Sequence, residues 1–216
     1  AGLFASYSVD AGATWTGRAI ATGASEVPAL PVGCCDPSVA WDQFGNLFFS
    51  YLDAAATATI VVVSTDGGQS FQLVASISAA DQPTVVVGPT STAGTGSVWI
   101  TQQRAGAIEV AGALVTGSGL VNIGAFTAPA VIVGSAGTGG NFGDIAIGPN
   151  GQVGVTWMAP TATQGPATMH FALDPDGLGP LPFSTAALIG GTNVGGFDYI
   201  PAHSNRSIDA SLGLAW

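Results

Sequence analysis

Apolar and polar residues alternate along much of this chain with a period of two, which is the pattern of β-strands. Runs rich in β-branched and aromatic residues recur at 46–52, 59–63, 84–87 and 97–101, each bounded by Gly, Pro, Asp or Asn. Asn150-Gly151 separates two further runs and favours the tight type I′ turn of a β-hairpin. No segment shows the period of an amphipathic helix. The pattern predicts an all-β protein.

The predicted hairpins form a repeating unit. Each unit opens near an aspartate, enters an apolar strand, turns, and continues into a strand that carries an aromatic residue. The openings are Asp36, Asp81, Asp144 and Asp209, which lie 45, 63 and 65 residues apart. Four strands in a unit of this length match one blade of a β-propeller. We therefore expect an all-β fold, a β-propeller of four-stranded antiparallel blades.

The repeat divides this single domain into blades at about 34–79, 80–134 and 141–192, with partial blades at 1–25 and 197–216. The termini could meet and complete one blade, or the chain could be part of a larger propeller. The stop at Trp216, where a second strand should begin, favours the larger propeller. Self-assembly through the terminal strands also stays open, because an unpaired strand edge invites pairing with another chain.

Composition narrows the function classes. The 216 residues include 13 acidic residues, three arginines and no lysine, for a formal net charge of −10. This balance excludes a basic patch for nucleic acid or anionic lipid. No apolar run reaches the roughly 18 residues that a membrane-spanning helix needs. Low charge and the absence of lysine favour an extracellular protein, secreted or on the cell surface.

The two cysteines, Cys34 and Cys35, are neighbours. Adjacent Cα atoms lie about 3.8 Å apart, below the usual span of a disulfide, so these residues cannot close an ordinary loop. A vicinal disulfide, two free thiols and bridges to another chain all stay open. No histidine lies nearby in sequence, so we predict no metal site there and no cofactor elsewhere.

One short motif, Ser-x-Asp-x-Gly-x-Thr-Trp, occurs twice. The first copy matches at every fixed position, and the second has Ser for Thr and Phe for Trp. Their residues are Ser8, Asp10, Gly12, Thr14 and Trp15, and then Ser64, Asp66, Gly68, Ser70 and Phe71. With these motifs the chain resembles the Asp-box (BNR) repeat β-propellers of the sialidase-like superfamily, over essentially its whole length.

The motif has a structural explanation. An aspartate in a tight turn accepts backbone N–H bonds, and a glycine supplies a positive φ. The Ser or Thr hydroxyl adds a local bond, and we expect the Trp or Phe ring to be buried beneath the turn. Asp10 and Asp66 are therefore predicted to stabilise the fold rather than to act on a ligand.

The resemblance also locates a ligand face. It implies that the motif turns join the third and fourth strands of each blade, on the face opposite the site. The starts of first strands and the ends of second strands then lie on the ligand face, together with Cys34, Cys35 and Asp81. Its candidate residues are Asp36, Asp53, Gln103, Arg104, Asn141, His203 and Arg206.

Sialidase chemistry, as the resemblance implies it, uses an arginine clamp for a carboxylate, a Tyr/Glu pair and an Asp acid. Guanidinium groups suit such a clamp because they offer paired donors. The family's Arg-Ile-Pro motif is absent, since Arg18 is followed by Ala and Ile. No catalytic residue is therefore assigned by motif, and the candidates are Arg104, Arg206, Asp53 and Tyr51.

The predicted function is a secreted or cell-surface module that binds glycan or another extracellular ligand without catalysis. Two alternatives stay open. One is a sialidase-like glycoside hydrolase of the exo-α-sialidase type, and the other is a structural subunit of an extracellular assembly.

Overall fold

The computed structural model describes residues 2–78, 81–136, 139–162 and 164–216. They form an all-β fold of three four-stranded and two two-stranded antiparallel sheets. Its one described helical turn is the short 3₁₀ segment η1 (Leu120–Asn122). No helix of this part of the chain is long and apolar enough to cross a membrane.

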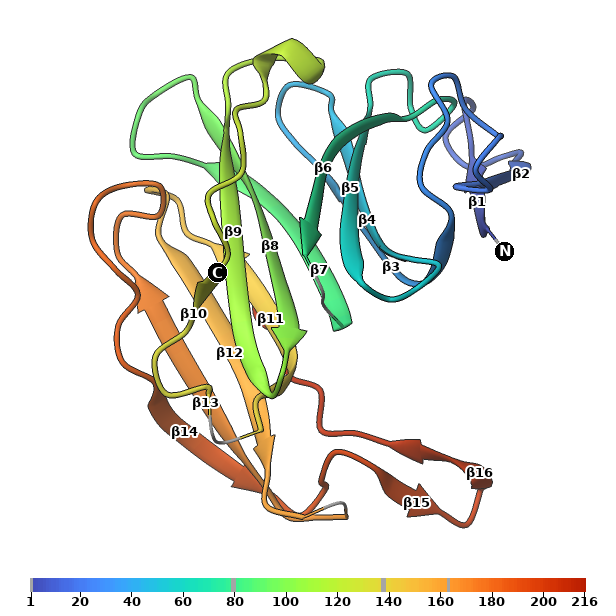
Figure 1. Ribbon diagram of the computed structural model, residues 1–216. Helices are drawn as coiled ribbons and strands as arrows, with labels where there is room; N and C mark the ends of the chain where they lie inside the picture. The colour runs from blue at the N-terminus through green and yellow to red at the C-terminus, as the bar shows by residue number, and fades with distance from the viewer. Residues whose placement is uncertain (1, 79–80, 137–138, 163) are drawn as a thin grey trace.

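The four-stranded sheets follow one another along the chain as the blades of a β-propeller, shown in Figure 1. Within each blade the strands pair in sequence order. The first blade holds β3 (Gly33–Trp41), β4 (Leu47–Asp53), β5 (Ala58–Ser64) and β6 (Gln72–Ser78). The second holds β7 (Asp81–Pro89), β8 (Gly96–Arg104), β9 (Ala107–Val115) and β10 (Ala130–Val131). The third holds β11 (Asn141–Ile147), β12 (Val153–Pro160), β13 (Ala167–Asp174) and β14 (Ala187–Thr192).

Two hairpins flank the blades. The first consists of β1 (Leu3–Tyr7) and β2 (Thr16–Ile20), and the second of β15 (Asp198–Ile200) and β16 (His203–Ile208). The C-terminal Trp216 lies against Gly148 of the third blade. The two hairpins are separate two-stranded sheets, so they do not combine into one four-stranded blade.

Apolar side chains fill the spaces between neighbouring blades. Phe48 and Val63 of the first blade pack with Ile100 of the second, and all three are buried. Trp99 of the second blade packs in the same way with Trp157 of the third. The middle strands are thus covered on both faces, which explains why residues 48–52 and 97–101 are buried continuously rather than alternately.

The first strand of every blade carries the same irregularity. Between Cys35 and Ser38, between Asp81 and Thr84, and between Asn141 and Asp144, the strand advances three residues while its partner advances two. This is a one-residue β-bulge. The bulged residues Asp36, Gln82 and Phe142 have φ of 53°, 52° and 49°. The repeat is therefore visible in the backbone itself.

The bulges correct the alignment of the repeat made from sequence. Asp36 lies on the bulge, Asp81 one residue before it, and Asp144 two residues after it. The four aspartates taken as equivalent openings thus occupy different places. In the last segment of the chain, after β16, the Leu214 N–H donates to Asp144 Oδ2 (2.7 Å), which joins that segment to the third blade.

Both motif turns have one hydrogen-bond pattern. In the first, the Thr14 N–H and hydroxyl donate to the two carboxylate oxygens of Asp10 at 2.8 and 2.6 Å. In the second, Ser70 makes the same pair of bonds to Asp66 at 2.8 and 2.5 Å. The turn joins β1 to β2 in one case and β5 to β6 in the other. The predicted structural role of both aspartates agrees with this geometry.

The aromatic residue of the motif does not behave alike in the two turns. Phe71 is buried and its ring lies 5.8 Å from that of Phe49. Trp15 is 65% exposed, and its indole N–H donates to the Gly12 carbonyl at 3.1 Å. The prediction of a buried ring is wrong for Trp15, because the motif specifies the turn but not the surface beneath it.

We expect Asp10→Asn to destabilise the fold at neutral pH. The bond from the Thr14 hydroxyl is the main cause that lowers the pKa of Asp10 from 3.8 to about 2. Folding therefore favours the carboxylate, so its stabilising effect is present above about pH 4 and is lost as the pH falls toward 2. Urea unfolding of both proteins at pH 7 and pH 2 measures the difference.

The matched control is Asp209→Asn, which removes an exposed aspartate outside the motif turns. It should leave the free energy of unfolding unchanged at both pH values. A difference between wild type and Asp10→Asn that is equally large at pH 2 would contradict the role of the charge.

Candidate functional site

The start of the first strand of each blade contributes to one polar cluster. Its members are Asp36, Asp81, Gln82, Asn141 and Phe142, which we call the rim cluster. The Gln82 N–H donates to Asp36 Oδ2 at 3.3 Å, and the Phe142 N–H donates to Gln82 Oε1 at 3.1 Å. Each bond joins the bulge of one blade to the bulge of the next. The bulges thus bring side chains from three blades together.

Asp36 and Asp81 form a carboxyl pair within the rim cluster. Asp36 is half-buried, and the Gln82 N–H donates both to Asp36 Oδ2 at 3.3 Å and to Asp81 Oδ1 at 3.0 Å, so the two carboxyl groups meet at one donor. Partial burial of the Asp81 carboxyl is the main cause that raises its pKa, and the nearby Asp36 side chain adds to it. The raised pKa favours the protonated form of Asp81.

The second blade places an amide opposite Asp81 and a cation at the end of the same strand. Gln103 lies directly opposite Asp81 in the β7–β8 register. Arg104 follows it and is exposed, and its Nη1 lies 3.4 Å from Oε1 of the buried Glu109. Gln102 donates to the other oxygen of Glu109 at 3.2 Å. The guanidinium is therefore held in place by a buried carboxylate.

Sequence reasoning missed Gln82 and Glu109. Gln82 occupies the same position on the bulge of β7 as Asp36 does on the bulge of β3, and the residue types do not reveal this equivalence. Glu109 was detectable, because a tight turn at Ala105-Gly106 places it across from Gln102. That register is a sequence signal for a cross-strand pair.

Asn141 and the cysteines lie where the sequence placed them, at the start of a first strand. Asn141 is half-buried, and its Oδ1 accepts the Phe142 N–H at 3.0 Å. Cys34 and Cys35 are joined in a vicinal disulfide with a Cα–Cα distance of 3.8 Å. This result selects one of the three states that the sequence left open.

Two candidate residues are engaged in structural bonds. Both carboxylate oxygens of Asp53 accept bonds from Thr57 in the β4–β5 turn, at 2.6 and 2.9 Å. Burial acts to raise the pKa of Asp53, but the bonds from Thr57 and Ala58 outweigh it and lower that pKa. Tyr51 is fully buried and donates to the Pro31 carbonyl at 2.8 Å. Burial, with a smaller contribution from Glu26, raises its pKa.

The side chains of His203 and Arg206 lie outside the described part of the structure, although the backbone of β16 is described. Of the other arginines, Arg18 pairs with Glu26 at 2.6 Å and also donates to the Gln69 carbonyl. Arg104 pairs with Glu109 in the second blade, whereas Arg18 lies in the β1–β2 hairpin. Among the described side chains, the structure assembles no arginine clamp.

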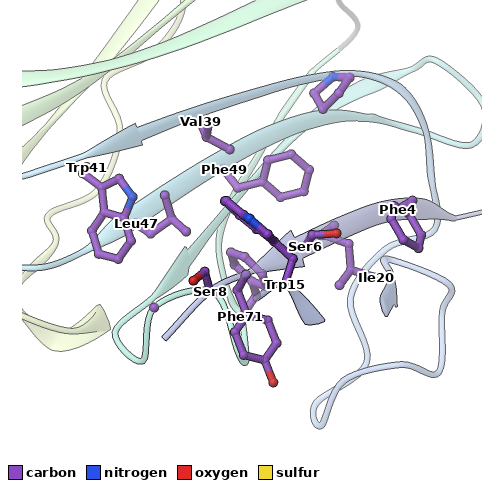
Figure 2. Close-up of a pocket in the computed structure, with 15 residues that line it drawn as sticks. Phe4, Ser6, Ser8, Trp15, Ile20, Val39, Trp41, Leu47, Phe49 and Phe71 are labelled. Atoms are coloured by element: carbon purple, nitrogen blue, oxygen red, sulfur yellow. The ribbon is translucent and has the colours of Figure 1, made fainter. Parts of the chain in front are cut away.

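A cavity lies elsewhere, between the β1–β2 hairpin and the first blade. It has a volume of about 500 Å³ and is mainly apolar. Figure 2 shows Trp15 in it, with Trp41 to one side and Phe4 to the other. Its lining contains one titratable group, Tyr7. We place the candidate site at the rim cluster, because acid–base chemistry needs groups that this cavity lacks.

Comparison with known proteins gives structural neighbours only. No family model matches the chain, and no curated protein matches it. The catalytic domain of an α-L-arabinofuranosidase from Coprinopsis cinerea aligns with a TM-score of 0.44 and 14% identity, over 73% of this chain and 51% of that one. An α-L-arabinofuranosidase from Podospora anserina gives 0.44 and 15%, over 74% and 52%. One from Lactobacillus brevis gives 0.43 and 8%, over 72% and 53%.

These neighbours concern the fold, and the chain spans about half of their length. None of the three is a sialidase, and the Asp-box family finds no support in the comparisons. The prediction of a non-catalytic binding module is corrected, because all three neighbours are enzymes that act on glycans.

We expect Asp81→Asn to stabilise the protein at neutral pH by up to about 1 kcal/mol, the range of exposed charge pairs. The raised pKa of Asp81 means that folding favours the protonated carboxyl. Its stabilising effect is therefore present below the ordinary pKa of 3.8 and is lost as the pH rises through the raised value. The amide keeps a donor toward Asp36 without the repulsion.

Chemical unfolding at pH 3 and pH 7 tests this sign. The gain should be present at pH 7 and absent at pH 3. A loss of stability at pH 7 would show that the two carboxyl groups do not repel each other in the folded protein.

Proposed function

We propose that this chain is part of a glycan-hydrolysing β-propeller, in which the Asp36–Asp81 pair donates a proton to the leaving oxygen of a glycosidic bond. The observation that carries the proposal is the pair of carboxyl groups at the rim cluster that accept the same Gln82 N–H, together with the raised pKa of Asp81. A general acid must hold its proton near the working pH, and a neighbouring carboxylate is one way to achieve this.

The pair acts as one acid rather than as two separate catalytic groups. Glycosidases that use two carboxylates hold them roughly 5–10 Å apart, so that a sugar or a water fits between them. Asp36 Oδ2 and Asp81 Oδ1 accept one backbone N–H, so the two carboxyl groups share a donor rather than flank a sugar. Asp81 therefore carries the proton, and the Asp36 carboxylate retains it until a leaving oxygen accepts it.

The surroundings of the pair suit a sugar. Gln82 and Gln103 offer amide groups, and the exposed Arg104 offers guanidinium N–H groups. Amides both donate and accept, which matches the hydroxyl groups of carbohydrates. The structural neighbours are α-L-arabinofuranosidases, so α-L-arabinofuranosides are the substrates to test first.

An extracellular location belongs to the same proposal. The Cys34–Cys35 disulfide is of a kind that persists in oxidising surroundings. The absence of lysine and the low charged content support it. Polymeric glycans outside the cell are the substrates that such a location makes available.

The test is hydrolysis of a panel of aryl glycosides, beginning with aryl α-L-arabinofuranosides. We expect Asp81→Asn and Asp36→Asn each to lower kcat/KM by about 10²–10⁴-fold, the usual contribution of a general acid. The wild-type rate should fall as the pH rises through the raised pKa of the pair.

The matched control is Asp42→Asn. Asp42 follows the other end of β3 and accepts bonds from the Phe44 and Asn46 N–H groups in a turn. This variant removes the same charge and should retain the wild-type rate. Equal activity in wild type and Asp81→Asn would refute the assignment, as would a panel of glycosides and polysaccharides with no turnover at all.

A further inference from the structure

The bulge of β3 differs from the other two in one respect. Gly33 lies opposite Asp53 and Cys35 lies opposite Leu52, so Cys34 is an additional residue in β3. A second irregularity follows at once between Cys35 and Ser38. In β7 and β11 the register shifts once. The start of β3 therefore has two consecutive irregularities, which leaves it fewer regular ladder bonds than its counterparts.

The vicinal disulfide lies at this doubly irregular segment. Its ring includes the peptide unit between Cys34 and Cys35, so it restricts the backbone of the two residues that precede Asp36. Asp36 itself has a φ of 53°, a conformation that costs a non-glycine residue about 1–2 kcal/mol. A covalent restraint next to such a residue limits the conformations to which it can relax.

Within the rim cluster, Asp36 is the residue whose contacts would be broken by such relaxation. Its carboxylate accepts the Gln82 N–H from the second blade and lies beside Asp81, whose Oδ1 accepts the same N–H. Both partners start β7, so one movement at the beginning of β3 would break the two contacts together. Ser38, beyond the bulge, makes a separate contact by accepting the Val85 N–H at 3.1 Å.

We propose that the Cys34–Cys35 disulfide is a redox-sensitive positioning group, which holds Asp36 against Asp81 and Gln82. A dithiol would remove this restraint by reducing the disulfide. Its two thiols give up two electrons and two protons and close to a disulfide, while the Cys34–Cys35 bond breaks and each sulfur becomes a thiol. Asp36 is then free to leave the pair. The inference does not depend on whether the pair hydrolyses glycans.

The first measurement is the titration of the aspartate side chains by ¹³C NMR, in the oxidised protein and after treatment with dithiothreitol. Separation from Asp36 should lower the pKa of Asp81 toward 3.8, the direction that Asp36→Asn also gives. The other charged groups at this edge, Arg104 and Glu109, are paired with each other and do not change with the disulfide.

The second measurement is amide hydrogen exchange, which needs neither activity nor a variant. Reduction should accelerate exchange at the Gln82 N–H, which would lose its bond to Asp36 and keep only the bond to Asp81 Oδ1, and leave the Val85 N–H unchanged. Val85 is the matched control, because its bond also crosses from the second blade to the first but ends beyond the bulge.

The double variant Cys34→Ser/Cys35→Ser serves as the chemical control. The chain has no other cysteines, so this variant should resemble the reduced protein and should not respond to dithiol. An unchanged Asp81 titration in protein that mass spectrometry shows to be reduced would overturn the proposal. Faster exchange at both Gln82 and Val85 would also overturn it, because the disulfide would then be a general staple.

Discussion

The structure depends on one recurring constraint, which is that neighbouring blades are joined through the first strands as well as through the apolar core. A backbone N–H of one first strand donates to a side chain of the preceding one, from Gln82 to Asp36 and from Phe142 to Gln82. Two of these bonds lie at the bulges, and a third, from the Val85 N–H to the Ser38 hydroxyl, crosses between the same first strands beyond the bulge. The core between blades is non-directional, whereas these bonds fix how each blade is placed on the next.

Much of the fold was predictable because its signals are local. The period of two, the Asn150-Gly151 turn and the two motif turns are each set by residues close together in sequence. Burial was not local in the same way. Phe71 packs on Phe49 while Trp15 faces a cavity, although both end the same motif. What covers a turn is decided by residues far away in the chain.

For the candidate site, the sequence indicated positions but not connections. The resemblance, read with the predicted strand order, placed Asp36, Gln103, Arg104 and Asn141 on one face, and their role as a ligand face stays a prediction. The pairing of Asp36 with Asp81, however, depends on bulges that share a positive φ and no residue type. Asp53 had the right residue type and chain position, yet its oxygens are occupied by the turn that it begins.

The bulges have the same backbone conformation in all three blades but carry different side chains. Cys35, Asp81 and Asn141 occupy one repeated position, and Asp36, Gln82 and Phe142 occupy the next. A disulfide-bonded cysteine, an acid and an amide thus use the same backbone position in three blades, followed by an acid, an amide and an aromatic ring. Different side chains can occupy such positions while the path of the backbone stays the same. The first strands of the three blades therefore offer equivalent positions, at which substitutions in one blade can change ligand specificity without changing the backbone.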